Sequence, residues 1–142
     1  MAAAVLVGTR LDGDGARTAG PVEIDTVLYG GSANEDPRAT AHVTKTGIGR
    51  VIDFDSDNLP TLPQGQYYEL WFVGPGDTPA RPNRISAGTF HPDEQGRSRV
   101  TFAAAVDPAA YPGVSVTSEP ADGNPQRTGP EALCRFRGCR PR

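Results

Sequence analysis

Hydrophobic and polar side chains alternate with a period of two along most of this chain, which is the pattern of β-strands rather than of amphipathic helices. Segments 22–28 and 39–43 each place their apolar residues on a single face. Thr46 and Gly47 separate the second segment from a third at 48–54, which predicts a hairpin between these two segments.

Strand patterns continue in the second half of the chain, at 66–73, 84–91, 97–103 and 113–119. The connecting stretches carry the Gly, Pro, Asp and Asn residues that sharp chain reversals need. Seven or eight short strands at this spacing predict an all-β fold, an antiparallel β-sandwich with Greek-key, immunoglobulin-like connections. We assign the sandwich to residues 22–136 and a basic tail to residues 137–142.

Glu69 lies in the most hydrophobic window of the chain, YYELWFV. Strand alternation places Tyr68, Leu70 and Phe72 on one face. Glu69 then shares the other face with Trp71. We expect Glu69 to be structural, near the margin of the sheet and paired with an arginine of a neighbouring strand. The candidate partners are Arg50, Arg97 and Arg99.

Composition and charge limit the kind of protein. A chain of 142 residues with 37% hydrophobic content fits one compact domain. Its formal net charge of -3 provides no basic field that would attract nucleic acid. Lys45 is the only lysine among 14 basic residues, a bias typical of GC-rich genomes.

The first residues, MAAAVLVG, are apolar but far shorter than the roughly 20 residues that cross a bilayer. They also lack the basic region of a signal peptide. Two interpretations stay open: a frayed N-terminus, or the outer end of a membrane helix that begins before Met1. Residues 9–21 contain glycine and charge without apolar periodicity, so we expect a flexible stalk there that proteases cut readily, with order beginning at Val22. Residues 1–21 would then be the end of a membrane helix and its stalk.

Residues suited to catalysis or metal binding are few. His42 and His91 are the only histidines, and because neither belongs to a zinc motif we expect surface or edge positions for both. Asp53, Asp55 and Asp57 alternate as in a calcium loop, but the glycine and glutamate that complete such a loop are missing. We therefore predict no catalytic, cofactor-binding or metal site and no enzyme, with a small hydrolase as the remaining enzymatic alternative.

Cys134 and Cys139 are the only cysteines, too few to stabilise a fold of this size by disulfides. They could form one disulfide only if the RFRG segment between them turns back, because five residues of extended strand separate α-carbons by roughly 16 Å. Gly138 allows such a turn, and an oxidising compartment would favour the bond. Two free thiols are the alternative.

Pro120 cannot donate a hydrogen bond to a strand ladder, so the strand before it should end there. The following segment, ADGNPQRTG, has too little apolar surface to become ordered by burial. We expect the Glu119 carboxylate to hold this segment by accepting backbone N–H groups from Gly123 or its neighbours.

Three stretches, YYELWFV, SAGTFHPDEQGRSRVTF and VSVTSEPADGNPQRTG, together resemble a known family. Their order and spacing are similar to those of the extracytoplasmic C-terminal domain of anti-sigma-K factors of the RskA type. The resemblance runs from about Gly65 to Gly129, and more loosely back to Val22. The residues that carry it are Tyr68, Glu69, Leu70, Trp71, Gly88, Phe90, Gly96, Glu119, Pro120 and Gly123.

The resemblance implies a single-pass membrane protein whose outer β-sandwich controls regulated proteolysis, with a site-1-type protease cutting the stalk. A sigma factor would be bound only by a cytoplasmic domain, which this sequence does not contain. The family tolerates glutamine at position 69, so the resemblance implies a hydrogen-bonding role for Glu69. The tail EALCRFRGCRPR is unlike the usual family ending, so the resemblance does not define a final strand. A secreted or tethered β-sandwich binding module without a sigma partner is the alternative.

Overall fold

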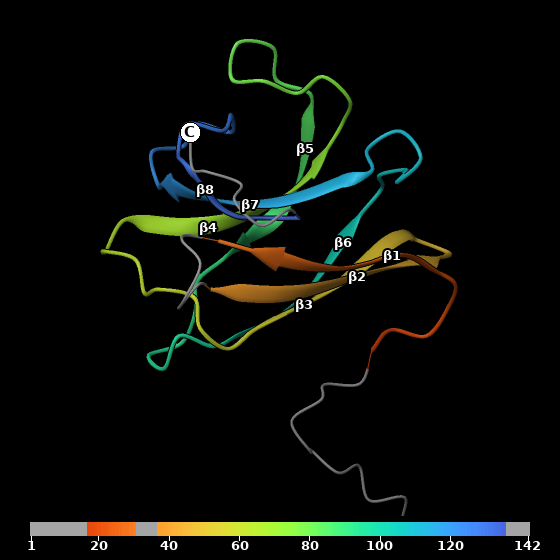
Figure 1. Cartoon of the computed structure of the whole chain (residues 1–142), viewed down its shortest axis with the longest axis horizontal. Helices are drawn as coiled ribbons and strands as arrows, with labels where there is room; N and C mark the ends of the chain where they lie inside the picture. Colours follow the sequence, from red (N-terminus) through yellow and green to blue (C-terminus); the bar gives the residue numbers. More distant parts are fainter. Residues whose placement is uncertain (1–16, 31–36, 136–142) are drawn as a thin grey trace, which may run out of the picture.

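The computed structural model describes residues 17–30 and 37–135, which form eight β-strands and no helix. No helix within these residues could therefore cross a membrane. The strands are β1 (Val22–Tyr29), β2 (Arg38–Thr46), β3 (Gly49–Ser56), β4 (Gln66–Val73), β5 (Arg84–Phe90), β6 (Ser98–Ala104), β7 (Gly113–Pro120) and β8 (Glu131–Cys134) (Figure 1).

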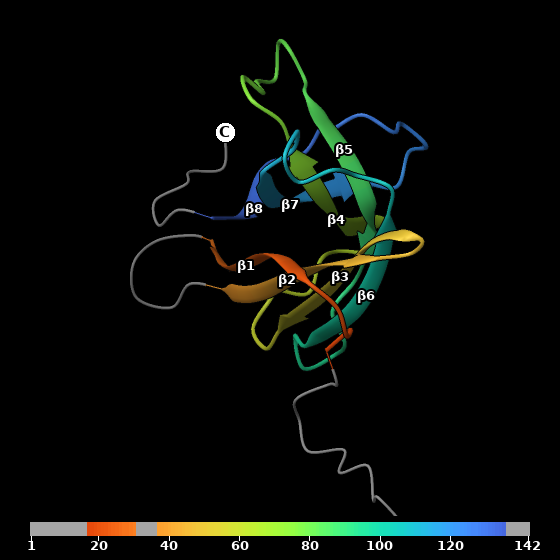
Figure 2. The same cartoon turned by 90° about the vertical axis from the view of Figure 1, so that its right-hand side faces the viewer.

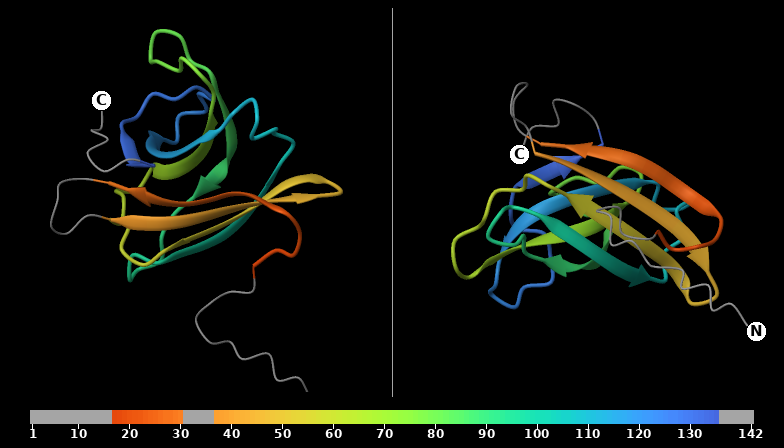
Figure 3. Two further views of the ribbon diagram at one scale, coloured as in Figure 1. Left: turned by 45° about the vertical axis from the view of Figure 1, so that its right-hand side comes forward. Right: turned by 90° about the horizontal axis from the view of Figure 1, so that it is seen from below.

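The strands pair in the antiparallel order β5-β4-β7-β8-β1-β2-β3-β6. Two layers, β5-β4-β7-β8 and β1-β2-β3-β6, face each other as in a sandwich (Figures 2 and 3). Between the layers, β1 pairs with β8 through Tyr29 and Cys134. The predicted antiparallel all-β fold is confirmed. The hairpin expected after the second strand is β2–β3, and β8 is the final strand that the sequence left open.

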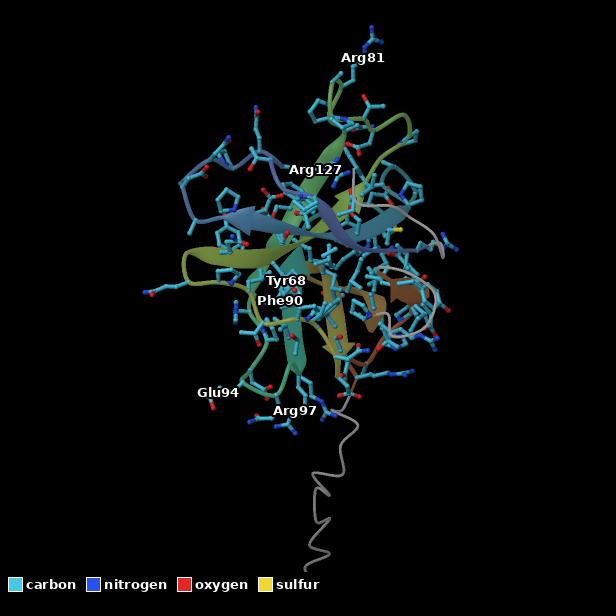
Figure 4. The ribbon with its side chains drawn as sticks, turned by 60° about the vertical axis from the view of Figure 1, so that its left-hand side comes forward. Tyr68, Arg81, Phe90, Glu94, Arg97 and Arg127 are labelled. Carbon is cyan, nitrogen blue, oxygen red and sulfur yellow. The ribbon has the colours of Figure 1, made fainter. Side chains whose placement is uncertain are left out.

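Alternating residues of both layers meet in one hydrophobic core. Tyr68, Leu70 and Phe72 of β4 share one face, as their alternation predicted; that face points into this core, and none of the three is more than 2% exposed. The ring centroid of Phe90 in β5 lies 5.6 Å from that of Tyr68 and 4.8 Å from that of Phe54 in β3. Figure 4 shows Tyr68 and Phe90 at the middle of the molecule, far from Arg81 at one end and Glu94 and Arg97 at the other.

The two end strands of the sheet, β5 and β6, approach each other at Gly88. This glycine has a φ of +147°, and a Cβ added to it would lie 2.5 Å from the Phe102 ring of β6. A residue without a side chain is therefore needed for this close approach. The approach brings the ring centroids of Phe90 and Phe102 to 6.0 Å. Gly88 and Phe90 of the AGTF stretch thus close the sandwich along one side.

Residues 17–21 precede β1 and are bound to the layer β1-β2-β3-β6. Thr18 donates its backbone N–H and its hydroxyl to the carboxylate of Asp53 at 2.7 and 3.1 Å. Farther along, the carbonyl of Pro21 accepts the Lys45 N–H at 2.9 Å. The expectation of a flexible stalk is therefore wrong from Thr18 to Pro21. The rest of the expected stalk, the apolar start and the basic tail lie outside the described residues.

Candidate functional site

A buried polar cluster lies on the face of the layer β5-β4-β7-β8 that points away from the core. It arises because alternate residues of β4 and β7 that do not face the core carry polar groups and one indole. We call this set of residues the outer cluster. Its members are Glu69, Trp71, Asp77, Arg84, Ser86, Thr117, Glu119, Thr128, Gly129 and Glu131.

One chain of hydrogen bonds in the outer cluster starts at Trp71, which is 3% exposed. Its indole Nε1 donates to the hydroxyl of Thr117 at 2.8 Å, and that hydroxyl donates to Oε1 of Glu119 at 2.6 Å. The second oxygen, Oε2, accepts the backbone N–H groups of Thr128 and Gly129, each at 2.9 Å. This series of hydrogen bonds therefore connects the buried indole of Trp71 to the segment that follows β7.

Glu119 thus holds this segment through a carboxylate, but not at the place that the sequence suggested. The expected donors were Gly123 and its neighbours, whereas the donors are Thr128 and Gly129. Gly123 instead has a φ of +77° and nothing near the position of an added Cβ, which is typical of an exposed turn. Gly129 lies so close to β7 that an added Cβ would be 1.5 Å from the carbonyl oxygen of Ser118. The strand β7 ends at Pro120, as predicted.

Glu69 is buried, with 7% exposure, and its Oε1 accepts the Ser86 hydroxyl at 2.6 Å. Its cross-strand neighbours are Thr89 of β5 and Thr117 of β7. The expected arginine pairing at the sheet margin is therefore wrong, because Glu69 is central in β4 and the strands beside it present hydroxyl groups. The three candidate arginines lie elsewhere and pair with other carboxylates: Arg50 with Glu23, Arg97 with Asp93 and Arg99 with Asp55.

Burial raises the pKa of Glu69 above its usual value, since desolvation disfavours the charged carboxylate. The hydrogen bond from Ser86 opposes this shift, and the negative charge of Glu119 adds to it. Two carboxylates thus share one side of the sheet, and within residues 17–30 and 37–135 no cation joins the hydrogen bonds that Glu69 and Glu119 make. Desolvation and the neighbouring carboxylate therefore both disfavour the charged form of Glu69.

Arg84 organises the second half of the outer cluster, and no sequence motif marks this residue. Its side chain is 5% exposed and donates from Nη2 to Asp77 and to Glu131, the latter at 3.0 Å. The guanidinium carbon also lies 5.6 Å from the ring centroid of Trp71, within the range of a cation–π contact. A single cation therefore joins the β4–β5 loop, the indole and β8.

The charges around Arg84 stabilise each other. Burial alone would raise the pKa of Asp77, but hydrogen bonds from Arg84 and from the Asn83 N–H hold it below its usual value. Burial alone would lower the pKa of Arg84, and its two carboxylate partners raise it instead. Arg127 approaches the same site, with Nη2 3.7 Å from Glu131 Oε1. The lowered pKa of Asp77 and the raised pKa of Arg84 both favour the charged forms of this ion pair at neutral pH.

Gly96, another residue that carries the family resemblance, helps to form the turn between β5 and β6. Gly96 donates its N–H to the Asp93 carbonyl at 2.9 Å and closes the turn between β5 and β6. The Asp93 carboxylate accepts the N–H groups of Gln95 and Arg97 in the same turn. Cys134 lies in β8, but Cys139 lies outside the described residues, so the disulfide stays a prediction.

The histidines differ from each other in their surroundings. His91 follows β5 and is exposed, and its Nε2 lies 3.3 Å from the Leu62 backbone nitrogen that donates to it. His42 is only 6% exposed in β2, and its Nδ1 lies 3.0 Å from Asp25 Oδ1. The expected surface position is wrong for His42 because β2 is an inner strand of its layer. In the part of the chain that the structure describes, no group of three or more His, Cys, Asp or Glu side chains could hold a metal ion.

The fold and the outer cluster define a β-sandwich domain in which a polar network fixes the connections between strands. The model of one protein family, the C-terminal domain of anti-sigma-K factor RskA, matches residues 1–132. The chain therefore belongs to this family of anti-sigma factor C-terminal domains, as the three motif stretches predicted. No curated protein and no solved structure matches the chain.

Proposed function

We propose that this domain is the extracytoplasmic part of a membrane-anchored anti-sigma factor and that it controls regulated proteolysis of its own N-terminal connection. Membership of the RskA C-terminal family supports this role. In this proposal a membrane helix and a cytoplasmic sigma-binding domain precede the residues described. The domain would then affect the sigma factor only through the chain segment that enters β1.

The observation that carries the proposal is the attachment of this segment to the sandwich. The Asp53 carboxylate accepts two hydrogen bonds from Thr18, and the carbonyl of Pro21 accepts one from Lys45. A protease binds its substrate as an extended, detached strand, so backbone held in this way is protected until it opens locally. The folded domain thus shields the end of its own connection, and a site-1-type protease would cut when that end is released.

The test is to replace Asp53 by Ala in the full-length protein in its host membrane and to map the first cleavage sites. Loss of the two hydrogen bonds from Thr18 should increase cleavage within residues 9–21 by about tenfold, equivalent to roughly 1.4 kcal/mol of easier opening. Transcription that depends on the sigma factor should increase with cleavage. Asp55→Ala is the matched control, because Asp55 lies on the same strand and pairs with the exposed Arg99.

Two results would contradict the proposal. Equal cleavage in the Asp53→Ala and Asp55→Ala variants would show that the attachment of Thr18 does not protect the segment. First cuts within β4 to β7, with residues 9–21 intact, would show that the sandwich rather than the connection is the sensitive part.

A further inference from the structure

A groove lined by both polar and apolar residues lies beside the attached N-terminal segment, on the face of β1-β2-β3-β6 that points away from the core. The groove has a volume of about 990 Å³. This is at the upper end of the roughly 300–1,000 Å³ typical of small-molecule sites. Its lining includes Arg17, His42, Asp53, Arg99 and Thr101.

His42 lines this groove and carries an unsatisfied acceptor beneath the groove surface. Its side chain is 8% exposed, and its Nδ1 lies 3.0 Å from Asp25 Oδ1. A carboxylate can only accept, so Nδ1 carries the proton and Nε2 of the neutral ring is an acceptor. Nε2 is fully buried and has no hydrogen-bond partner among the described residues. An unpaired buried acceptor is unfavourable, so a ligand that displaces the atoms covering Nε2 and donates a hydrogen bond to it would be stabilised at this point.

Asp53 lies directly opposite His42 in the β2–β3 pairing. Its carboxylate is occupied by the N–H and hydroxyl of Thr18, and Oδ1 also lies 3.2 Å from the donating hydroxyl of Thr101. Two adjacent donors from one residue thus fill the carboxylate. A ligand with two neighbouring hydroxyl groups could replace Thr18 with the same number of hydrogen bonds.

The charges of the groove indicate a neutral ligand. Three arginines and three aspartates line it, so their formal charges balance. Two of these residues form an ion pair with each other, with Arg99 Nε 3.3 Å from Asp55 Oδ2. An anionic or cationic ligand would have to disturb this balance, whereas a neutral polyol can both donate to the carboxylates and accept from the guanidinium groups.

We propose that this groove binds a neutral oligosaccharide, with one hydroxyl donating to His42 Nε2 and a vicinal pair competing with Thr18 for Asp53. Binding would release residues 17–21 from the sheet. The proposed binding depends only on the residues of the groove. Its effect on cleavage rests on the proposed function given above. The ligand would therefore act as the signal that exposes the connection to the protease.

The experiment is a titration of the isotope-labelled chain with maltohexaose, cellohexaose, mannohexaose and arabinohexaose, followed by backbone and imidazole NMR shifts. At least one of these sugars should give saturable shifts at His42, Asp53 and Thr101. Thr18→Ala removes a competing hydroxyl and should tighten binding by at least about threefold, a change that damage to the fold would not produce. His42→Asn keeps a donor to Asp25 but lacks Nε2, and should weaken binding by about tenfold.

His42→Gln is the matched variant, because its amide reaches the position of Nε2 and should bind more tightly than His42→Asn. Absence of saturable shifts with all four hexasaccharides would overturn the proposal. So would equal affinities for the Thr18→Ala variant and the unaltered chain. Binding without any effect on cleavage of the full-length protein would leave the site in place and remove only its link to proteolysis.

Discussion

Thr117 donates its hydroxyl to the carboxylate of Glu119 over 2.6 Å, two residues along the same strand. The same hydroxyl accepts the indole N–H of Trp71 at 2.8 Å. One oxygen atom therefore connects the largest aromatic side chain of β4 to the carboxylate that orders the segment after β7. Such a chain is cooperative, since each group orients the next and none has access to water as an alternative partner.

Replacement of Thr117 by Val tests this connection with almost no change of volume. It leaves the Trp71 indole N–H without its acceptor in a buried position, so the free energy of unfolding should fall by about 1–3 kcal/mol. Thr117→Ser keeps the hydroxyl and should lose less than about 1.5 kcal/mol, the loss expected for one methyl group. Denaturant titration would measure both. A loss in Thr117→Ser together with no loss in Thr117→Val would show that the methyl group, and not the hydroxyl, is what matters.

Replacement of Glu119 by Gln should release the segment that follows β7. The amide can present only one oxygen, so the donors of Thr128 and Gly129 lose a charged acceptor. We expect a loss of about 1.5–3 kcal/mol of stability and faster hydrogen exchange at these two amides. The control is Asp122→Asn, an exposed position in the same segment, which should change stability by less than about 0.5 kcal/mol. Unchanged exchange at Thr128 and Gly129 would disprove the anchoring role.

The sequence predicted the strands because burial imposes a period of two, and that signal is local. Tyr68, Leu70 and Phe72 share one face as their alternation required, and that face points into the core. The partner of Glu69 could not be predicted in the same way. A partner depends on which strands become neighbours, and β4 lies between β5 and β7 rather than beside a strand that carries the candidate arginines.

The site around Arg84 escaped prediction for a related reason. Asp77 lies seven residues before Arg84, but Glu131 lies 47 residues after it and reaches it only because β8 pairs with β7. The expectation of a surface or edge position for His42 depends on its belonging to no zinc motif, and the absence of a motif carries no information about burial. Its burial follows from the central position of β2, which is a property of the sheet order and not of the local pattern.

Glu69 should make the stability of the domain depend on pH in one direction. Its pKa is higher in the folded chain than in the unfolded chain, so its stabilising contribution is complete below the unfolded pKa. This contribution is lost as pH rises through the raised folded pKa. Glu69→Gln keeps an acceptor for Ser86 and removes the titration, so it should be the more stable form at neutral pH and lose that advantage in acid.

The measurement is the unfolding free energy of the Glu69→Gln variant and the unaltered chain between pH 4 and pH 8. Trp71→Ala provides the contrast, because removal of a buried indole should lower stability by about 3–5 kcal/mol at every pH. If the difference in unfolding free energy between the Glu69→Gln variant and the unaltered chain did not depend on pH, the raised pKa of Glu69 would be contradicted. Large and equal losses in both variants would show that the charge of Glu69 is itself stabilising.

Asp77 should give the opposite pH dependence. Its pKa is lower in the folded chain, so its contribution is present above the unfolded pKa and is lost as pH falls through the folded pKa. Asp77→Asn leaves Arg84 with Glu131 as its remaining carboxylate partner. We expect a loss of about 1.5–3 kcal/mol at neutral pH. The difference in unfolding free energy between Asp77→Asn and the unaltered chain should become smaller as the pH falls below the unfolded pKa of aspartate.

Asp55→Asn is the control for Asp77, because it also removes a carboxylate from an arginine pair. Both partners of that pair are exposed, with side-chain exposures of 50% for Arg99 and 38% for Asp55. Water screens their interaction, so this change should lower stability by less than about 1 kcal/mol. Similar losses for Asp55→Asn and Asp77→Asn would mean that the burial of Arg84 adds nothing to its ion pair. A much larger loss for Asp77→Asn, confined to pH values above its folded pKa, is the result expected if Arg84 joins the β4–β5 loop to β8.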